Sequence, residues 1–136
     1  MQKKGFSLME LVMVLLIIAI VSSVIITDLI SSLSATRLGT AKWKLASDIL
    51  YAQNLSVTRQ INHGVIFVPD SNNYSLYSQN TTNIEKDPTS PDKDFTVDYS
   101  IDPNFKGVSL NSPSFGDRLE FDSFGTPSDG TTNLAA

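Results

Sequence analysis

The sequence of 136 residues lacks cysteine entirely, so neither a disulfide bond nor a thiolate metal site is available. It has one histidine, His63, and none of the Gly-x-Ser-x-Gly, His-Glu-x-x-His or phosphate-loop patterns of common catalytic sites. A catalytic base at His63 would need a nucleophile and an orienting group around it. We therefore predict a chain that is not an enzyme and has no cofactor, in which His63 is a loop or capping residue beside Gly64.

Positive charge is scarce in the second half of the chain. Residues 61–136 contain four Lys or Arg against eleven Asp or Glu, a net charge of −7, whereas the whole chain carries −4. Because binding to a phosphate backbone requires clustered Lys and Arg, this composition argues against nucleic acid as a partner. Asp87, Asp92 and Asp94 share one polar loop, but their spacing matches no calcium loop. We predict no metal site, and calcium in residues 85–94 stays open as the alternative.

Long apolar runs are absent except near the amino terminus. There, Leu11–Ile30 is apolar with Ser22, Ser23 and Asp28 as its main interruptions. About 20 apolar residues in a helix cover the roughly 30 Å hydrocarbon core of a bilayer. The run therefore predicts a transmembrane helix.

Charge is unevenly placed around this run. Lys3 and Lys4 precede it and the nearest cation beyond it is Arg37, so the positive-inside rule places the amino terminus in the cytoplasm. Glu10 lies at its edge, and a carboxylate in a membrane helix costs on the order of 2.5–3.5 kcal/mol at the centre and less near an end. Since intramembrane ionisable groups usually pair, we expect a partner cation for Glu10. The alternative is a carboxylate that reaches the lipid headgroups.

Proline is missing between Thr27 and Arg59, and Gly39 is the only glycine there. This predicts one helix from Phe6 to about Arg59, with Gly39 as the expected point of bending or fraying. Apolar residues in its second half recur at spacings of three and four and form a stripe that we expect to pack on a sheet: Leu38, Ala41, Leu45, Ile49, Ala52 and Leu55.

The polar and aromatic residues of this second half are expected outside the apolar stripe. Most of its polar residues, Asp48 among them, are expected on the other faces of the helix. Trp43 and Tyr51 are interpreted as partly buried aromatic residues near the sheet. A contact with another subunit is the alternative, because aromatic residues are enriched in interfaces.

After Asn62 the period of hydrophobicity changes to two, which predicts an antiparallel sheet. The polar segment Gln79–Asp94 is expected to be an exposed loop. Alternation predicts that Ile101 is buried together with Phe95, Val97 and Tyr99. The expected strands are Val65–Val68, Tyr74–Tyr77, Phe95–Ile101, Gly107–Leu110 and Arg118–Phe121, with turns at Pro69–Asn73 and Asp122–Pro127.

The hexapeptide Gly5-Phe6-Ser7-Leu8-Met9-Glu10, between a basic leader and the apolar run, resembles the class III leader of type IV pilins and type II secretion pseudopilins. In that family a prepilin peptidase cuts after the glycine and methylates the new amino terminus. The resemblance implies cleavage between Gly5 and Phe6, and N-methylation of Phe6. It also implies that Lys3 and Lys4 set the topology. The carboxylate of Glu10 would pair with the terminal amine of a neighbouring subunit during assembly.

Two later stretches, Asp48–Gln60 and Phe121–Pro127, resemble the GspH/FimT group of minor pseudopilins and minor pilins. The second has that group's Phe-Asp…Gly-Thr-Pro turn. This chain departs from the pattern at Thr27, where most pilins have a proline, and at its end, where the group usually adds another strand pair. We expect either a truncated chain or a sheet that closes short and exposes a strand edge.

Together these features predict an α+β, pilin-like fold in which a long amino-terminal helix packs on an antiparallel sheet. Residues 1–5 would be a cleaved leader, 6–30 a transmembrane and filament-core helix, 31–60 its amphipathic continuation, and 61–136 a β region.

The resemblance implies a minor pseudopilin at or near the tip of a type II secretion pseudopilus, held in the inner membrane with its carboxy-terminal domain in the periplasm. Its partners would be a prepilin peptidase, other pilin or pseudopilin subunits, and an inner-membrane assembly platform. The alternative is a minor pilin of a type IV pilus that acts in assembly initiation, adhesion or DNA uptake.

Overall fold

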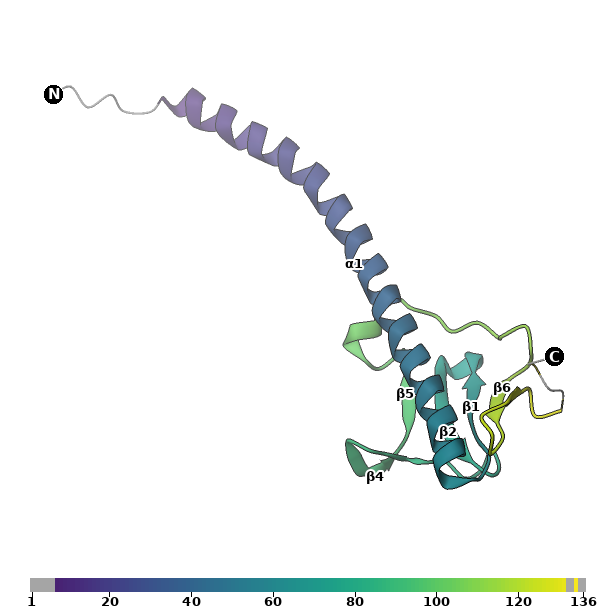
Figure 1. The fold of residues 1–136 in the computed structure, drawn as a ribbon. Helices are drawn as coiled ribbons and strands as arrows, with labels where there is room; N and C mark the ends of the chain where they lie inside the picture. Colours follow the sequence, from purple (N-terminus) through teal and green to yellow (C-terminus); the bar gives the residue numbers. More distant parts are fainter. Residues whose placement is uncertain (1–6, 132–133, 135–136) are drawn as a thin grey trace. The chain divides into compact units, whose positions relative to one another are not determined.

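The computed structural model describes residues 7–131 and residue 134, without the side chains of residues 23–31. The chain divides into two compact units, Met1–Thr36 and Arg37–Ala136. A single helix, α1 (Leu8–Arg59), contributes to both units and is helical through Gly39, so the predicted fraying at that residue is absent. Its end at Arg59 agrees with the prediction (Figure 1).

In the second unit, α1 packs on a five-stranded sheet with the strand order β5-β2-β1-β6-β7. Every strand pair in it is antiparallel, which confirms the predicted α+β fold. The strands are β1 (His63–Val68), β2 (Asn73–Ser78), β5 (Thr96–Asp98), β6 (Arg118–Phe121) and β7 (Pro127–Ser128). A separate hairpin pairs β3 (Lys86–Asp87) with β4 (Ser90–Asp94), so Gln79–Asp94 is not the plain loop expected from its polarity.

The core lies between α1 and the sheet. Two small residues of α1, Ala41 and Ala52, are at most 2% exposed and allow the helix to approach the strands closely. The ring of Tyr99 makes edge contacts with Tyr74 and Phe105, with centroids 5.8 and 5.0 Å apart. Aromatic pairs in this geometry stabilise a core beyond their buried area.

A tyrosine–carboxylate hydrogen bond crosses the central strand. Gly64 of β1 is paired with Tyr77 of β2 on one side and with Glu120 of β6 on the other. The Tyr77 hydroxyl donates to Glu120 at 2.9 Å and lies so close to Gly64 that a β-carbon there would be 2.7 Å from the tyrosine ring. Burial raises the pKa of Tyr77, and the Glu120 carboxylate adds to the shift, so the phenol remains a donor. Glycine is required here because the ring occupies the space of a side chain.

The turn between β1 and β2 also organises a distant segment. The turn forms a short 3₁₀ helix, η1 (Pro69–Ser71), and Asn72 follows it in the left-handed conformation. The side-chain amide of Asn72 donates through Nδ2 to the Val108 carbonyl at 3.0 Å and accepts through Oδ1 from the backbone amide of Leu110 at 2.6 Å. The predicted strand Gly107–Leu110 is therefore wrong, because one side chain supplies the hydrogen bonds that a strand neighbour would provide.

The prediction for the strand at Phe95–Ile101 is correct only in part. Phe95 and Tyr99 are buried, but β5 ends at Asp98, whose carboxylate accepts from the Ser100 amide at 2.7 Å and starts a turn. A second 3₁₀ helix, η2 (Pro103–Phe105), follows. Alternation therefore stops before Ile101, which is 78% exposed and not in the core.

Candidate functional site

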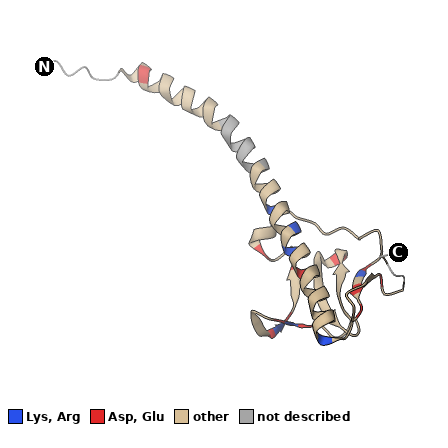
Figure 2. Cartoon of the chain, in the orientation of Figure 1, with Lys and Arg blue, Asp and Glu red and all other residues tan. Residues whose placement is uncertain are grey.

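The first turn of α1 carries the carboxylate that the sequence singled out. Glu10 is exposed there, and helical hydrogen bonding starts where the Leu11 amide donates to the Ser7 carbonyl at 3.1 Å. Glu10 is the only charged residue from Leu8 to Val21 (Figure 2). An acid in a first turn is favoured by the helix dipole. The predicted topology and processing residues Lys3, Lys4, Gly5 and Phe6 lie outside the described residues.

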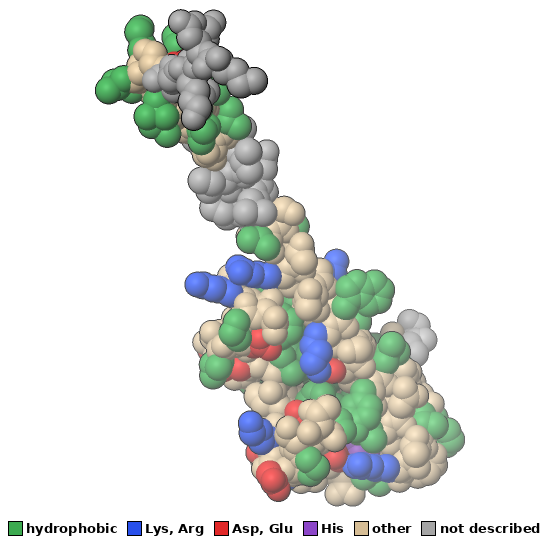
Figure 3. Space-filling view, turned by 90° about the vertical axis from the view of Figure 1, so that its left-hand side faces the viewer, with side chains coloured by type: hydrophobic (Ala, Val, Ile, Leu, Met, Phe, Trp, Pro, Cys, Tyr) green, Lys and Arg blue, Asp and Glu red, His purple; other side chains and the backbone are tan. Residues whose placement is uncertain are grey.

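The first part of α1 is apolar, and its large side chains are exposed among the described residues. Every large apolar side chain from Leu8 to Val21 is at least 46% exposed, and Figure 3 shows such side chains at the surface of this end of α1. Exposed apolar surfaces of this kind are typical of interaction sites with protein or lipid. None of the helices in the described part of the chain combines the length and the hydropathy of a membrane span.

A buried carboxylate joins α1 to the sheet in the second unit. Asp48 is 5% exposed, and Lys44 Nζ donates to both of its oxygens at 2.7 Å. The Tyr74 hydroxyl donates to the same carboxylate at 2.6 Å. Burial raises the pKa of Tyr74 far above its ordinary value, and hydrogen bonding to Asp48 raises it further. The phenol therefore stays protonated and keeps donating to Asp48.

The prediction that Asp48 lies away from the sheet is wrong. The residue is seven positions after Ala41 and four before Ala52, so it shares their side of the helix. Its helical position, rather than its polarity, was the signal that could have found it.

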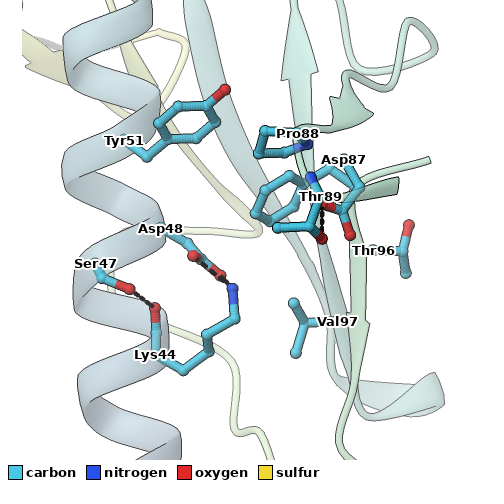
Figure 4. Close-up of a pocket in the computed structure, with 10 residues that line it drawn as sticks. Lys44, Ser47, Asp48, Tyr51, Asp87, Pro88, Thr89, Thr96 and Val97 are labelled. Carbon is cyan, nitrogen blue, oxygen red and sulfur yellow. Dashed lines mark hydrogen bonds and ion pairs between the residues drawn. The ribbon is translucent and has the colours of Figure 1, made fainter. Parts of the chain in front are cut away.

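A hollow of about 410 Å³ opens beside this carboxylate, between α1 and the β3–β4 hairpin (Figure 4). One wall is aromatic, because Tyr51 stacks on Phe95 with ring centroids 6.0 Å apart. The Lys44 ammonium lies 5.0 Å from the centroid of the Phe95 ring, within cation–π range. The Lys44–Asp48 pair is satisfied internally, so this arrangement stabilises the contact between helix and sheet.

The two aromatic residues of α1 differ in their environment. Tyr51 is partly buried beside Phe95, which confirms its interpretation. Trp43 is 79% exposed, so the interpretation of it as a partly buried residue near the sheet is wrong.

His63 lies in a different place from the one predicted. It is a buried residue of β1, only 1% exposed, and not a loop or capping residue. Its Nδ1 is 3.0 Å from the Ile61 carbonyl oxygen, and its Nε2 is 3.3 Å from Glu85 Oε1. Arg59 also contacts Glu85 Oε1, at 2.8 Å. Burial alone would raise the pKa of Glu85, but the hydrogen bond and charge of Arg59 outweigh it and hold that pKa below the ordinary value.

Two acidic residues of the β3–β4 hairpin, Asp87 and Asp94, have partners within it. Asp87 accepts from the amide and hydroxyl of Thr89 at 2.7 and 2.6 Å, and these hydrogen bonds lower its pKa. Asp94 pairs with Lys86 at 2.6 Å. Across residues 7–131 and 134, no three His, Cys, Asp or Glu side chains gather in a group that could hold a metal ion.

Comparison with known proteins gives a match for the amino-terminal part of the chain only. A family model described as the prokaryotic N-terminal methylation motif matches residues 1–26. That range contains the basic leader, Gly5, Phe6 and Glu10. No curated protein and no solved structure matches the chain.

The chain therefore carries the signal of type IV pilin-like proteins, the class of structural subunits that the leader resembles. The motif implies processing by a prepilin peptidase and assembly with other pilin subunits, and it is typical of membrane-anchored pilus subunits.

Proposed function

We propose that the chain is a minor pseudopilin incorporated into a type II secretion pseudopilus, close to its tip. The observation that carries the proposal is the methylation motif, followed directly by an apolar helix whose side chains are exposed. Assembly, rather than catalysis, is the work that such a surface can perform. An uncovered apolar helix gains free energy when neighbouring helices or lipid surround it.

The proposed pathway begins in the inner membrane. Lys3 and Lys4 hold the amino terminus in the cytoplasm, and residues 61–136 lie in the periplasm. A prepilin peptidase removes residues 1–5 by cutting between Gly5 and Phe6, and Phe6 is N-methylated. Residues 6–30 then enter the filament core, and residues 31–60 present the sheet-bearing half of the helix.

Glu10 gives this assembly its direction. A carboxylate and an amine are each costly in an apolar environment, and they neutralise one another when brought together. Glu10 is exposed in the first turn of α1, so its carboxylate is accessible to the terminal amine of a neighbouring subunit. Docking of each new subunit is therefore coupled to removal of two charges from an apolar surface.

The test is affinity purification of the tagged full-length protein from inner membranes after mild crosslinking, with its neighbours identified by mass. We expect other minor pseudopilins together with a secretion ATPase and a secretin. Recovery of a major pilin with a retraction motor would instead assign the chain to a type IV pilus. Recovery of no pilin-like partner would contradict both assignments.

A further inference from the structure

A second apolar stripe lies on α1, roughly opposite Ala41 and Ala52. Trp43, Leu50 and Val57 are 79%, 57% and 44% exposed, whereas Ala41 and Ala52 face the core. The three exposed residues recur at intervals of seven, which keeps them nearly aligned along a helix. We call Trp43, Leu50 and Val57 the outer stripe.

The amino-terminal end of the outer stripe is hollowed. A cavity of about 270 Å³ is lined by Gly39, Lys42, Trp43 and Ala46. Apart from the adjacent residues and backbone of α1, no described atom lies within 4 Å of the position that a β-carbon on Gly39 would occupy. Small residues on both sides of a large one form the kind of hole that receives a side chain of a second helix.

We propose that the outer stripe is the docking surface for Leu8–Val21 of a second copy of this chain. The inference rests on the proposed function, because it needs copies that assemble side by side. Spacing by seven selects a helix as the partner, and Leu8–Val21 is a helix whose large apolar side chains are exposed. Leu8–Val21 is also long enough, since at 1.5 Å per residue it spans about 20 Å, whereas Trp43 and Leu50 lie about 10 Å apart along α1.

The charges of the two surfaces complement one another. Glu10 is the only charged residue of Leu8–Val21, and Lys42 is the only charged residue lining the hollow. Lys42 takes part in none of the ion pairs formed among the described residues. A carboxylate has two oxygens, so Glu10 accommodates Lys42 beside a terminal amine.

This pairing fixes the direction of the docked helix. With Glu10 beside Lys42, the residues that follow Glu10 lie along the outer stripe only when the two helices run parallel. Ile17 is seven residues after Glu10, and Leu50 is eight residues after Lys42, so these two side chains come together. An antiparallel helix in the same register would lead away from Leu50.

The absence of cysteine allows a direct test with full-length chains in membranes that contain the assembly machinery. One tagged copy carries Ile17→Cys and a differently tagged copy carries Leu50→Cys, and a short thiol crosslinker is added. The control replaces Leu50→Cys by Ile101→Cys, at a residue that is 78% exposed and outside the outer stripe. We expect the Ile17–Leu50 product in several-fold excess over the Ile17–Ile101 product.

A charge variant checks the register. Lys42→Glu should lower the yield of the Ile17–Leu50 product several-fold, whereas Lys93→Glu, at an exposed lysine of β4, should leave it unchanged.

Three results would overturn the inference. The first is equal crosslinking of Ile17 to Leu50 and to Ile101, and the second is a dominant Leu50–Leu50 product, which indicates outer stripes packed face to face. The third is an Ile17–Ile17 product without Ile17–Leu50, which leaves the proposed filament assembly standing and removes only the docking surface. Failure of the proposed function itself is recognised separately, by chains that retain residues 1–5 and give no crosslinked product.

Discussion

Some single residues of this chain stabilise the fold, and Asp48 is the clearest example. It is buried and accepts hydrogen bonds from Lys44 and Tyr74. Asp48→Ala leaves the ammonium and the phenol without their acceptor, so we expect a loss of about 2–3 kcal/mol in the free energy of unfolding. Thermal unfolding of the full-length protein in detergent, followed by circular dichroism, measures it. Asp92→Ala, at an exposed hairpin residue, is the control, and an equal loss in both variants would contradict the role given to Asp48.

The pH dependence of stability should report on Glu85. Its pKa in the folded protein lies below the ordinary value of 4.5 because Arg59 outweighs the effect of burial. The folded state therefore favours the ionised form, and this stability is present above pH 4.5 and is lost as the pH falls through the lower folded pKa. Glu85→Gln should be less stable than the wild type at pH 7, and the difference should shrink towards pH 3. Unfolding at several pH values measures it, and a difference that is constant with pH would exclude this linkage.

Glu10 carries the functional task in the proposed assembly. We expect Glu10→Ala to be cleaved normally but incorporated into the filament several-fold less, because the docking charge is lost while the cleavage sequence is intact. Intact mass of the membrane-extracted protein measures removal of residues 1–5, and sheared filaments measure incorporation. Normal incorporation of the variant would remove the docking argument, and a wild-type chain that keeps residues 1–5 beside an active prepilin peptidase would contradict the cleavage position.

Among the elements, β1 is the one most constrained by its neighbours. A β-carbon at Gly64 would lie 2.6 Å from the Leu119 carbonyl oxygen and 2.7 Å from the Tyr77 ring. Gly64→Ala must displace one of them, so we expect a loss of about 1–3 kcal/mol from overpacking. Gly39→Ala is the contrasting variant, since its methyl group meets no described atom within 4 Å outside the adjacent part of α1 and should stabilise α1 by about 1 kcal/mol. Thermal unfolding of both variants tests the pair, and equal shifts would show that the two glycines are not distinguished by their surroundings.

The sequence predicted the elements where side-chain pattern and chain connectivity agree. Alternation and turn residues located β1, β2 and β6. The absence of proline predicted that α1 continues to about Arg59, where it ends. The predictions failed where one side chain replaces a strand, as Asn72 does at Val108 and Leu110. They also failed at the β3–β4 hairpin, because its side chains are mostly exposed and polar and apolar residues do not alternate there.

The candidate site was predictable to a different degree in its two parts. The leader residues and Glu10 form a local motif, which the family model also matches. Asp48 and the outer stripe depend instead on which side of α1 meets the sheet. The spacing of Ala41 and Ala52 predicted that side correctly, and Asp48 was missed because it was placed by its polarity rather than by its helical position.

At the scale of the whole molecule, the single tryptophan provides a spectroscopic reporter of assembly. Trp43 is 79% exposed in the isolated chain, so its fluorescence should be that of a solvated indole. Docking of a second helix on the outer stripe should bury the ring, and we expect its emission maximum to shift to shorter wavelength on assembly. Emission spectra of detergent-extracted monomer and of purified filaments measure this. An unchanged maximum in filaments would show that Trp43 stays in water and would remove the outer stripe from the interface.

The bond from Tyr77 to Glu120 has a mechanical consequence for the assembled molecule. β1 follows α1 after three residues, so tension along the helix is transmitted into the sheet at its central strand. That strand is held by ladders on both sides, and the phenol–carboxylate bond ties the two flanking strands together across it. Pulling β1 out of the sheet requires the hydrogen bonds to β2 and to β6 to break at the same time, together with the hydrogen bond from Tyr77 to Glu120. In the proposed filament, tension along α1 would therefore reach the sheet at the strand that is held on both sides.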